Sequence, residues 1–335
     1  MLAVVDEAIP SVRPRYGLRF MVGLIAIAGA GAYVCAPAPV GELRAAPPAL
    51  GAGADAQRLE AHVRALAKGP RSGRGQPRAL HEAAEYVQTE LERAGYGATK
   101  ERLTTDFENV VARMGPEAGA RIVVGAHYDT VEDTPGADDN ASGVAALIEL
   151  ARLLRTATVT CPVELVAYAL EEPPFFRTPD MGSSEHARSL ATRHVEVRAM
   201  LSLEMLGTYS DAPSSQNFPS AFLAEKYPSA ANFVLVVGRL EDRALAEKTR
   251  DAMSISPSLP IYAFVAPATF AGVDFSDHAS YWAAGYSAVM ITDTAFFRNP
   301  RYHAPADTPD MLDYPRLAHA TNAVFAAVLA LCESP

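Results

Sequence analysis

Cysteine and positive charge are both scarce in this sequence. Its three cysteines, Cys35, Cys161 and Cys332, lie far apart and form no CxxC pair. We therefore expect neither a disulfide framework nor a zinc site built from cysteine. Lysine and arginine together number 29, against 39 aspartates and glutamates, which leaves a net charge of −10. A nucleic-acid partner is not expected, because binding phosphate requires a basic face.

One long apolar run lies near the amino terminus, FMVGLIAIAGAGAYVCA at residues 20–36, and three arginines precede it. A positive flank before an apolar core is typical of an export signal. Its length of about 17 residues falls between a signal core and a minimal membrane span. We expect residues 1–37 to be a cytoplasmic start plus a signal peptide or signal anchor, 38–55 a Pro/Ala-rich linker, and 56–335 the folded domain. That domain would be extracytoplasmic, either secreted or anchored through the N-terminal segment only.

Within the domain, segments of helical periodicity alternate with short apolar runs typical of strands. Helices are predicted at 56–67, 79–94, 144–154, 183–192, 241–253, 277–284 and 314–331. Strands are predicted at 98–103, 109–114, from 121, and at 163–170, 197–206, 231–237, 262–265 and 288–292. Such alternation predicts an α/β fold, with a mostly parallel mixed central sheet and helices on both faces. We find no internal repeat and no second domain.

The stretch RIVVGAHYDTVEDTPGADDNASG, residues 121–143, carries the first candidate site. Its apolar start predicts a buried strand that ends in His127 and Asp129. Side chains two residues apart on a strand point to the same side, so these two can meet. The following loop holds Asp138 and Asp139 directly before a predicted helix. Imidazole and carboxylate groups at a strand end are ligands that suit a divalent cation.

Two further strands end in acids. Glu171 and Glu172 follow the strand 163–170, and adjacent carboxylates point different ways. One of the pair can therefore bind metal while the other faces a substrate. Glu204 lies inside the apolar run LSLEML, where a carboxylate is costly unless it is paired or bound to metal. For Glu204 we favour a metal ligand over a structural salt bridge.

A second histidine follows the strand 288–292. His303 lies in the stretch YHAPADT, and we expect Asp307 to orient its ring through the other nitrogen. In open α/β sheets, ligands bind at the carboxyl ends of the strands. The candidate residues all fall at such ends, so they are expected to share one site.

Several motifs now match a known family in order: GAHYD (125–129), GADDNASG (136–143), EE (171–172), GSSEHARSL (182–190), LEM (203–205), SDHASYWAAGYSAVMITDT (276–294) and YHAPADT (302–308). In these stretches the sequence resembles the co-catalytic zinc exopeptidases of peptidase family 28. That family includes bacterial leucyl aminopeptidases and the glutamate carboxypeptidase group. The resemblance covers essentially all of residues 56–333.

The resemblance implies two zinc ions per chain and a ligand for each position of the pattern. His127 and Glu204 would hold one ion. Glu172 and His303 would hold the other, and Asp139 would bridge both. Many members of the family have Asp where this chain has Glu204, and the longer side chain changes the geometry of that position.

The resemblance also implies which residues take part in catalysis. Glu171 would be the general base for a water that bridges the metals and attacks a peptide bond, and Asp129 would brace His127. The peptide bond from Asp139 to Asn140 would be cis, and Asp138 would not be a ligand. The implied activity is that of an exopeptidase, with an aminopeptidase favoured, acting on a peptide or a small aminoacyl substrate.

Three alternatives remain at this stage. Glutaminyl cyclases are similar to this family and use a single zinc, and a non-catalytic binding domain could use the same fold. A carboxypeptidase would need arginines close to the metals, and Arg177, Arg298 and Arg301 lie near ligands in the sequence.

The segment PPFFRTPDM after Glu172 is expected to shape the substrate pocket. Candidate lining residues are Phe175, Phe176, Phe297 and Tyr302.

Overall fold

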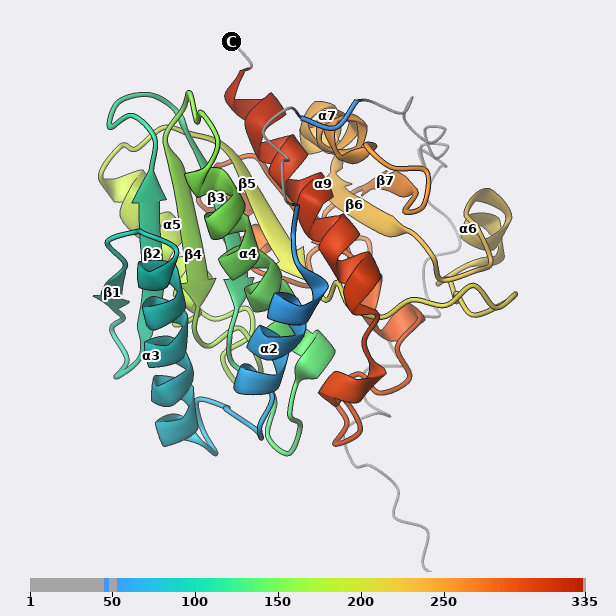
Figure 1. Cartoon of the computed structure of the whole chain (residues 1–335), viewed down its shortest axis with the longest axis horizontal. Coiled ribbons are helices and arrows are strands. Elements are labelled where there is room, and N and C mark those ends of the chain that lie inside the picture. The colour runs from blue at the N-terminus through green and yellow to red at the C-terminus, as the bar shows by residue number, and fades with distance from the viewer. Residues whose placement is uncertain (1–44, 48–52, 334–335) are drawn as a thin grey trace, which may run out of the picture. The chain divides into compact units, whose positions relative to one another are not determined.

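The computed structural model describes residues 45–47 and 53–333 (Figure 1). The predicted export segment at 1–37 lies outside the described residues, as does most of the predicted linker at 38–55. The first described helix, α2 (Ala56–Leu66), begins after Asp55. The Asp55 carboxylate accepts hydrogen bonds from the backbone N–H groups of Gln57 and Arg58. Such a cap satisfies amide groups that the first turn of a helix leaves free.

An eight-stranded mixed sheet lies at the centre of the described fold, in the order β1-β2-β4-β3-β5-β8-β6-β7. The adjacent strands β4, β3, β5 and β8 are parallel to one another. Strand β2 is antiparallel to β1 and β4, and β6 is antiparallel to β8 but parallel to β7. The strands are β1 (Thr99–Arg102), β2 (Glu108–Met114), β3 (Arg121–His127), β4 (Val163–Tyr168), β5 (Val197–Glu204), β6 (Val234–Arg239), β7 (Ile261–Ala266) and β8 (Ala288–Thr292).

Helices cover both faces of this sheet, which confirms the predicted fold class. In Figure 1, α2, α3, α4 and α9 lie in front of the strands, and α5 passes behind β2 and β4. Helix α4 is buried along almost its whole length because it is covered by the sheet on one side and by other helices on the other. The remaining helices are α3 (Pro77–Arg93), α4 (Gly143–Arg155), α5 (Gly182–Thr192), α6 (Ala221–Lys226), α7 (Arg243–Met253), α8 (His278–Ala283) and α9 (Tyr314–Cys332).

The predicted elements are present, with ends displaced by a few residues. Strand β6 begins at Val234 rather than at Ala231. Helix α6 was not predicted, because six residues are too few to show a helical period. The connecting segment that contains α6 joins β5 to β6 and contributes to the candidate site described below.

The expectation about cysteine is wrong for one pair. A disulfide joins Cys161, which lies just before β4, to Cys332 at the end of α9. The two residues are 171 positions apart, and both are buried. Spacing in the sequence did not indicate the pairing, because only the packing of α9 against the rest of the domain brings these side chains together. The disulfide thus fastens the last helix to the central sheet.

Helix α9 is the one helix among residues 45–47 and 53–333 that is long and apolar enough to cross a membrane. Within its most apolar window, 67% is buried inside the fold. Leu317, Val324 and Val328 are completely covered and belong to the main apolar cluster. Burial in the interior of the domain therefore explains the apolar composition of α9.

A buried acid, Glu164 of β4, holds several elements together away from the site. Its carboxylate contacts Arg121 of β3, lies 3.1 Å from the guanidinium of Arg113, and lies 2.9 Å from Nε2 of His186 on α5. Burial opposes ionisation of Glu164, but His186, Arg121 and Arg113 outweigh it and lower the pKa of Glu164 to about 2. An ionised Glu164 therefore stabilises the folded state.

We expect Glu164→Gln to destabilise the protein by about 3 kcal/mol at neutral pH, because it removes the ionised partner of Arg121, whose side chain is 17% exposed, and of the buried His186. The folded pKa lies below the ordinary value of 4.5, so the stabilisation is present above pH 4.5 and is lost as the pH falls toward 2. Below pH 4.5 the difference in the free energy of unfolding between the unaltered protein and Glu164→Gln should narrow by about 1.4 kcal/mol per pH unit. Urea unfolding of both proteins in chelator, from pH 7 to pH 3.5, measures this. A difference that stayed constant across the range would contradict it.

Candidate metal centre

The predicted site residues meet at the carboxyl edge of the parallel strands. His127 is the last residue of β3 and Glu204 the last of β5. Glu171 and Glu172 follow β4 directly, and His303 lies in the turn after β8. Except for His303, whose side chain is 29% exposed, these side chains are almost completely buried. Adjacent parallel strands end at the same edge, which is why separate stretches of the sequence converge here.

The side chains form two clusters. In the first, Nε2 of His127 lies 3.4 Å from Oδ1 of Asp139 and 3.5 Å from Oε2 of Glu204. In the second, Nε2 of His303 lies 3.1 Å from Oδ2 of Asp139 and 3.3 Å from Oε2 of Glu172. Within each cluster the three potential ligand atoms all lie within 4.8 Å of one another. Each cluster thus offers one imidazole nitrogen and two carboxylate oxygens.

Asp139 belongs to both clusters. One of its carboxylate oxygens faces His127 and the other faces His303. Asp139 is 3% exposed and lies in the segment η2 (Ala137–Ser142), at a kink where its own backbone angles are not helical and its peptide bond to Asn140 is cis. The arrangement is that expected of a carboxylate that bridges two cations.

The loop that carries Asp139 is held by its neighbours. The buried Asp307 carboxylate accepts hydrogen bonds from the backbone N–H groups of Asp138 and Asp139, each at 3.1 Å. The expectation that Asp307 orients the His303 ring is therefore wrong. Asp307 instead fixes the backbone of the loop, because two adjacent amide groups point toward its carboxylate.

Asp138 faces away from both clusters. Its carboxylate accepts hydrogen bonds from the backbone N–H of Gly207, the hydroxyl of Thr208 and the side-chain amide of Asn299. These three partners engage both oxygens of a fully buried side chain. Asp138 thus ties the loop to the chain segments that follow β5 and β8.

Asp129 connects β3 to the pair of glutamates. Its Oδ1 lies 3.4 Å from Nδ1 of His127, on the side of the ring opposite the first cluster. The same carboxylate accepts hydrogen bonds from the backbone N–H groups of Glu171 and Glu172, each at 3.0 Å. One side chain therefore positions a histidine and both acids that follow β4.

Glu171 belongs to neither cluster, although it lies beside the first. Its Oε2 is 3.9 Å from Nε2 of His127. Burial raises the pKa of Glu171 well above its ordinary range, against the opposing charge of His127. Burial likewise raises the pKa of Glu172 to about 7. These two adjacent acids point into the site from one strand end but have different neighbours.

Serine side chains that the sequence analysis did not single out support Glu204. The hydroxyl of Ser276 donates a hydrogen bond of 2.7 Å to Oε2 of Glu204, and it lies 2.9 Å from the hydroxyl of Ser202. Both serines are buried. Ser202 precedes Glu204 by two residues on the same strand, so the side-chain alternation of β5 could have indicated it. The position of Ser276 depends on the tertiary fold.

The donor set of the two clusters fits divalent cations. Five acids, namely Asp129, Asp139, Glu171, Glu172 and Glu204, surround two imidazoles in a buried space. Within the described part of the chain, Oε1 of Glu172 is buried without a hydrogen-bond partner. Concentrated buried carboxylates are costly unless cations balance them. Nitrogen and oxygen ligands in this number and mixture suit zinc.

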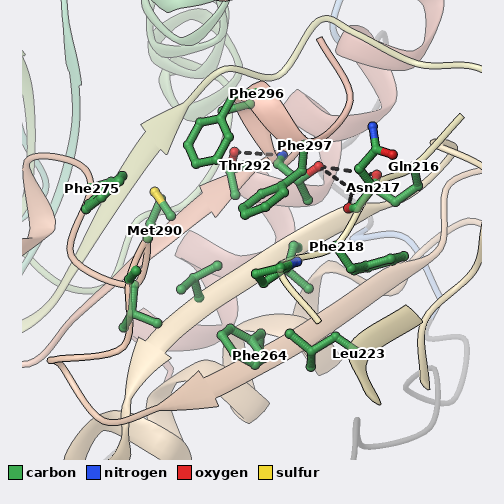
Figure 2. Close-up of a pocket in the computed structure, with 18 of the residues that line it drawn as sticks. Gln216, Asn217, Phe218, Leu223, Phe264, Phe275, Met290, Thr292, Phe296 and Phe297 are labelled. Atoms are coloured by element: carbon green, nitrogen blue, oxygen red, sulfur yellow. Dashed lines mark hydrogen bonds between the residues drawn. The ribbon is translucent and has the colours of Figure 1, made fainter. Parts of the chain in front are cut away.

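An apolar pocket adjoins the first cluster (Figure 2). It holds about 830 Å³ of empty space, part of it open to solvent, and Glu204 forms part of its wall. Figure 2 shows Phe218, Phe264, Phe275, Phe296 and Phe297 around this space, together with Met290 and Leu223. A wall of mostly apolar and aromatic side chains with few polar groups is typical of sites that bind small ligands.

The prediction about pocket residues is partly correct. Phe297 and Tyr302 line the pocket, and Tyr302 stacks on the ring of His303 at 3.7 Å between ring centroids. Phe175 packs instead against the main apolar cluster, so its predicted place in the pocket is wrong. Phe176 lies behind the wall and contacts Phe275 edge-on. Most of the wall comes from residues 216–237 and 264–275, whose distance from the ligands in the sequence concealed their role.

Arg177 and Arg298 near the site are engaged by protein groups, whereas within the described part of the chain Nε of Arg301 is buried without a hydrogen-bond partner. Arg298 is buried, and its guanidinium donates to Gln216 and to the backbone carbonyl oxygens of Thr208 and Phe233. Arg177 pairs with Asp274 and lies over aromatic rings. Arg298 thus acts as a structural anchor for the segments around the pocket.

A sheet of parallel strands that ends in two clusters of histidine and acids is an arrangement typical of metal-dependent hydrolases. The family model described as "Peptidase family M28" matches residues 109–328. The chain therefore belongs to peptidase family M28 and is a peptide hydrolase.

Three individual proteins are also similar to this chain. It is 43% identical over 256 residues to "Uncharacterized protein YfbL" of Escherichia coli, covering 73% of this chain and 78% of that protein. It is 28% identical over 258 residues to a "Probable leucine aminopeptidase" of Arthroderma otae, covering 72% of this chain but 62% of the relative. Among solved structures, LapB from Legionella pneumophila has a TM-score of 0.68 at 21% identity, covering 85% and 74% of the two chains.

One further structure bears on the cyclase alternative. A Bacteroides thetaiotaomicron glutaminyl cyclase has a TM-score of 0.62 at 18% identity, covering 85% of this chain and 99% of that one. At this identity the likeness concerns the fold alone. The fold does not separate a peptidase from a cyclase, and the residues of the site must do so.

Proposed function

We propose that this chain is a zinc-dependent aminopeptidase that holds two zinc ions. The observation that carries the proposal is Asp139, whose two oxygens each face a different cluster of one histidine and one glutamate. His127 and Glu204 would complete one binding position. His303 and Glu172 would complete the other. When bound, zinc would polarise a peptide carbonyl and make a water molecule more acidic.

The protein's own groups would then handle the proton. Glu171 is close to the first cluster but outside both; with zinc bound, the added positive charge would favour its ionised form, and the carboxylate could take a proton from the attacking water. It would pass that proton to the departing amine. Asp129 fixes the start of the Glu171–Glu172 segment through two backbone hydrogen bonds, which keeps the base aimed at the site. Burial of Glu171 excludes bulk water that would compete for the proton.

The charge of the site supports an aminopeptidase over a carboxypeptidase. A free amino terminus is positively charged, and the site presents several buried acids to it. A substrate carboxylate would need a guanidinium; Arg298 donates to Gln216 and to backbone oxygens and Arg177 pairs with Asp274, which leaves Arg301 as the candidate for that role. The apolar pocket beside Glu204 would accept the side chain of the terminal residue. Apolar terminal residues are therefore the expected substrates.

Peptides blocked at one end test this proposal. We expect a carboxyl-amidated peptide with amino-terminal leucine to be hydrolysed at a rate close to that of the free peptide. The amino-acetylated peptide should react at least about 100-fold more slowly, because the charge that the acids bind is gone and the barrier rises by about 2.7 kcal/mol. Mass spectrometry of the products measures both rates.

A peptide with amino-terminal glutamine serves as the control for the rival function. Release of glutamine would support the peptidase, whereas loss of ammonia with the chain intact would identify a cyclase. Faster hydrolysis of the acetylated peptide than of the amidated one would contradict the aminopeptidase assignment. Binding of the peptides without any turnover would favour the non-catalytic alternative.

We also propose that the domain works outside the cytoplasm, attached through residues 1–37 or released after their removal. The pattern of arginines before an apolar run supports export. The buried disulfide between Cys161 and Cys332 supports it too, since disulfides persist mainly in oxidising compartments. Cell fractionation of the full chain and of a chain without residues 1–37 tests this. Identical distribution of the two would refute it.

A further inference from the structure

A buried arginine connects the two ends of the loop that joins His127 to the turn carrying Asp139. Arg71 lies between α2 and α3 and is 1% exposed. Its Nε donates to the carbonyl oxygen of Tyr128 at 2.6 Å. Its two terminal nitrogens donate to the carbonyl oxygens of Pro135 at 2.5 Å and Gly136 at 3.0 Å. A longer contact of 3.4 Å reaches the carbonyl oxygen of Leu66.

The positions of these carbonyl groups relate Arg71 to the metal clusters. Tyr128 lies between His127, a ligand of the first cluster, and Asp129, which braces it. Gly136 immediately precedes the turn that carries Asp139. A planar guanidinium with donors in a fixed fork spans the gap between the two backbone segments. The spacing of His127 and Asp139 is thus set partly by the shape of one side chain.

The backbone around this contact has little room to adjust. Gly136 has a φ of 60°, and a Cβ added there would lie 2.3 Å from the carbonyl oxygen of Asp139. The backbone N–H of Arg71 is itself fixed, since it donates to the hydroxyl of Thr130 at 3.0 Å. Both ends of the link are therefore anchored in closely packed backbone.

The charge of Arg71 is balanced from a distance. Among the described residues, its guanidinium donates to backbone carbonyl oxygens and forms no ion pair within 4.0 Å. Burial lowers the pKa of Arg71 to about 10, against the opposing influence of Asp129, Asp307 and Asp139. Arg71 thus remains charged, and its counter-charges are the acids of the centre and of its supports.

We propose that Arg71 is a positioning residue that holds His127 and Asp139 at the separation that zinc binding requires. The inference rests on the proposed function, because it assumes that these side chains bind zinc. It concerns the shape of the guanidinium rather than its charge alone. A lysine at this position would keep the positive charge but could not donate to carbonyl oxygens at both ends of the loop in the same geometry.

Zinc titration of chelator-treated proteins tests the proposal without relying on activity. We expect Arg71→Lys and Arg71→Met each to weaken zinc binding at least tenfold while circular dichroism shows a folded domain. The matched control is Arg250→Lys, which changes a buried arginine on α7 that pairs with Asp251 and should leave zinc binding unchanged.

Each other outcome overturns the proposal. If Arg71→Lys binds zinc like the unaltered protein, only the charge matters. If both variants melt at lower temperature but bind zinc normally, Arg71 supports the fold and nothing more. Should neither variant fold, Thr130→Val removes only the anchor of the Arg71 backbone and is expected to weaken zinc binding several-fold. Unchanged affinity in that variant would also refute the inference.

The same titration separates this inference from the proposed function. Failure of the unaltered protein to bind zinc would refute the proposed function itself. An unaltered protein that binds two zinc ions, together with Arg71 variants that bind them equally well, would refute only the role of Arg71.

Discussion

Replacing Glu171 by glutamine is expected to reduce kcat by roughly 10²–10⁴-fold, the range typical for loss of a general base. Glutamine keeps the size of the side chain but cannot accept the proton. Because Glu171 lies outside both ligand clusters, the variant should still bind two zinc ions with nearly unchanged affinity. Peptide hydrolysis and metal analysis of the same sample measure this. We expect hydrolysis to be almost abolished while the zinc content stays at two ions per chain.

Glu172 provides the matched control, since it is the adjacent acid on the same strand end. Glu172→Gln removes a carboxylate of the second cluster and is expected to lower zinc content. The Glu171 variant should therefore lose turnover but keep its zinc, whereas the Glu172 variant should lose zinc. If the Glu171 variant lost metal while the Glu172 variant retained it, the roles assigned to these neighbours would have to be exchanged.

Asp139→Asn is expected to disrupt both metal positions at once. An amide offers one acceptor oxygen, so only one cluster can keep its ligand, and the NH₂ group would face the histidine of the other. Zinc content should fall from two per chain to one or none. We expect kcat/KM to fall by roughly 10²-fold or more, since loss of one transition-state stabiliser has an effect of that size.

The neighbouring acid again supplies the comparison. Asp138 is equally buried, but its carboxylate is engaged by Gly207, Thr208 and Asn299. Asp138→Asn is expected to lower the free energy of unfolding while two zinc ions remain bound. Equal loss of zinc from both variants would contradict the bridging role of Asp139.

The sequence could predict the fold and the grouping of the acids for a physical reason. Apolar runs that end in His127, in Glu171 and in Glu204 place these residues at one edge of a parallel sheet, whatever the details of packing. Glu204 was recognisable because an acid inside an apolar strand needs a compensating partner. At these positions, the local sequence pattern and the general topology of parallel sheets together were sufficient to predict that the residues share one site.

Other parts of the site depend on contacts between distant segments. Arg71 lies in a polar loop, RSGRG, that by composition suggests a solvent-exposed turn. Asp307 was assigned to His303 because the two are close in sequence, yet the backbone of the η2 turn lies nearer in space. The pairing of Cys161 with Cys332 has the same origin. Periodicity and spacing carry no information about which remote segments become neighbours.

The support that Asp307 gives to the Asp139 turn has a consequence for biosynthesis. The two residues are 168 positions apart, and the turn depends on a carboxylate near the end of the chain. A nascent polypeptide that has not yet reached Asp307 therefore presents a histidine and several acids without the frame that aligns them. Zinc binding at both proposed positions would then require synthesis to have passed Asp307, so the proposed activity would arise only late in synthesis.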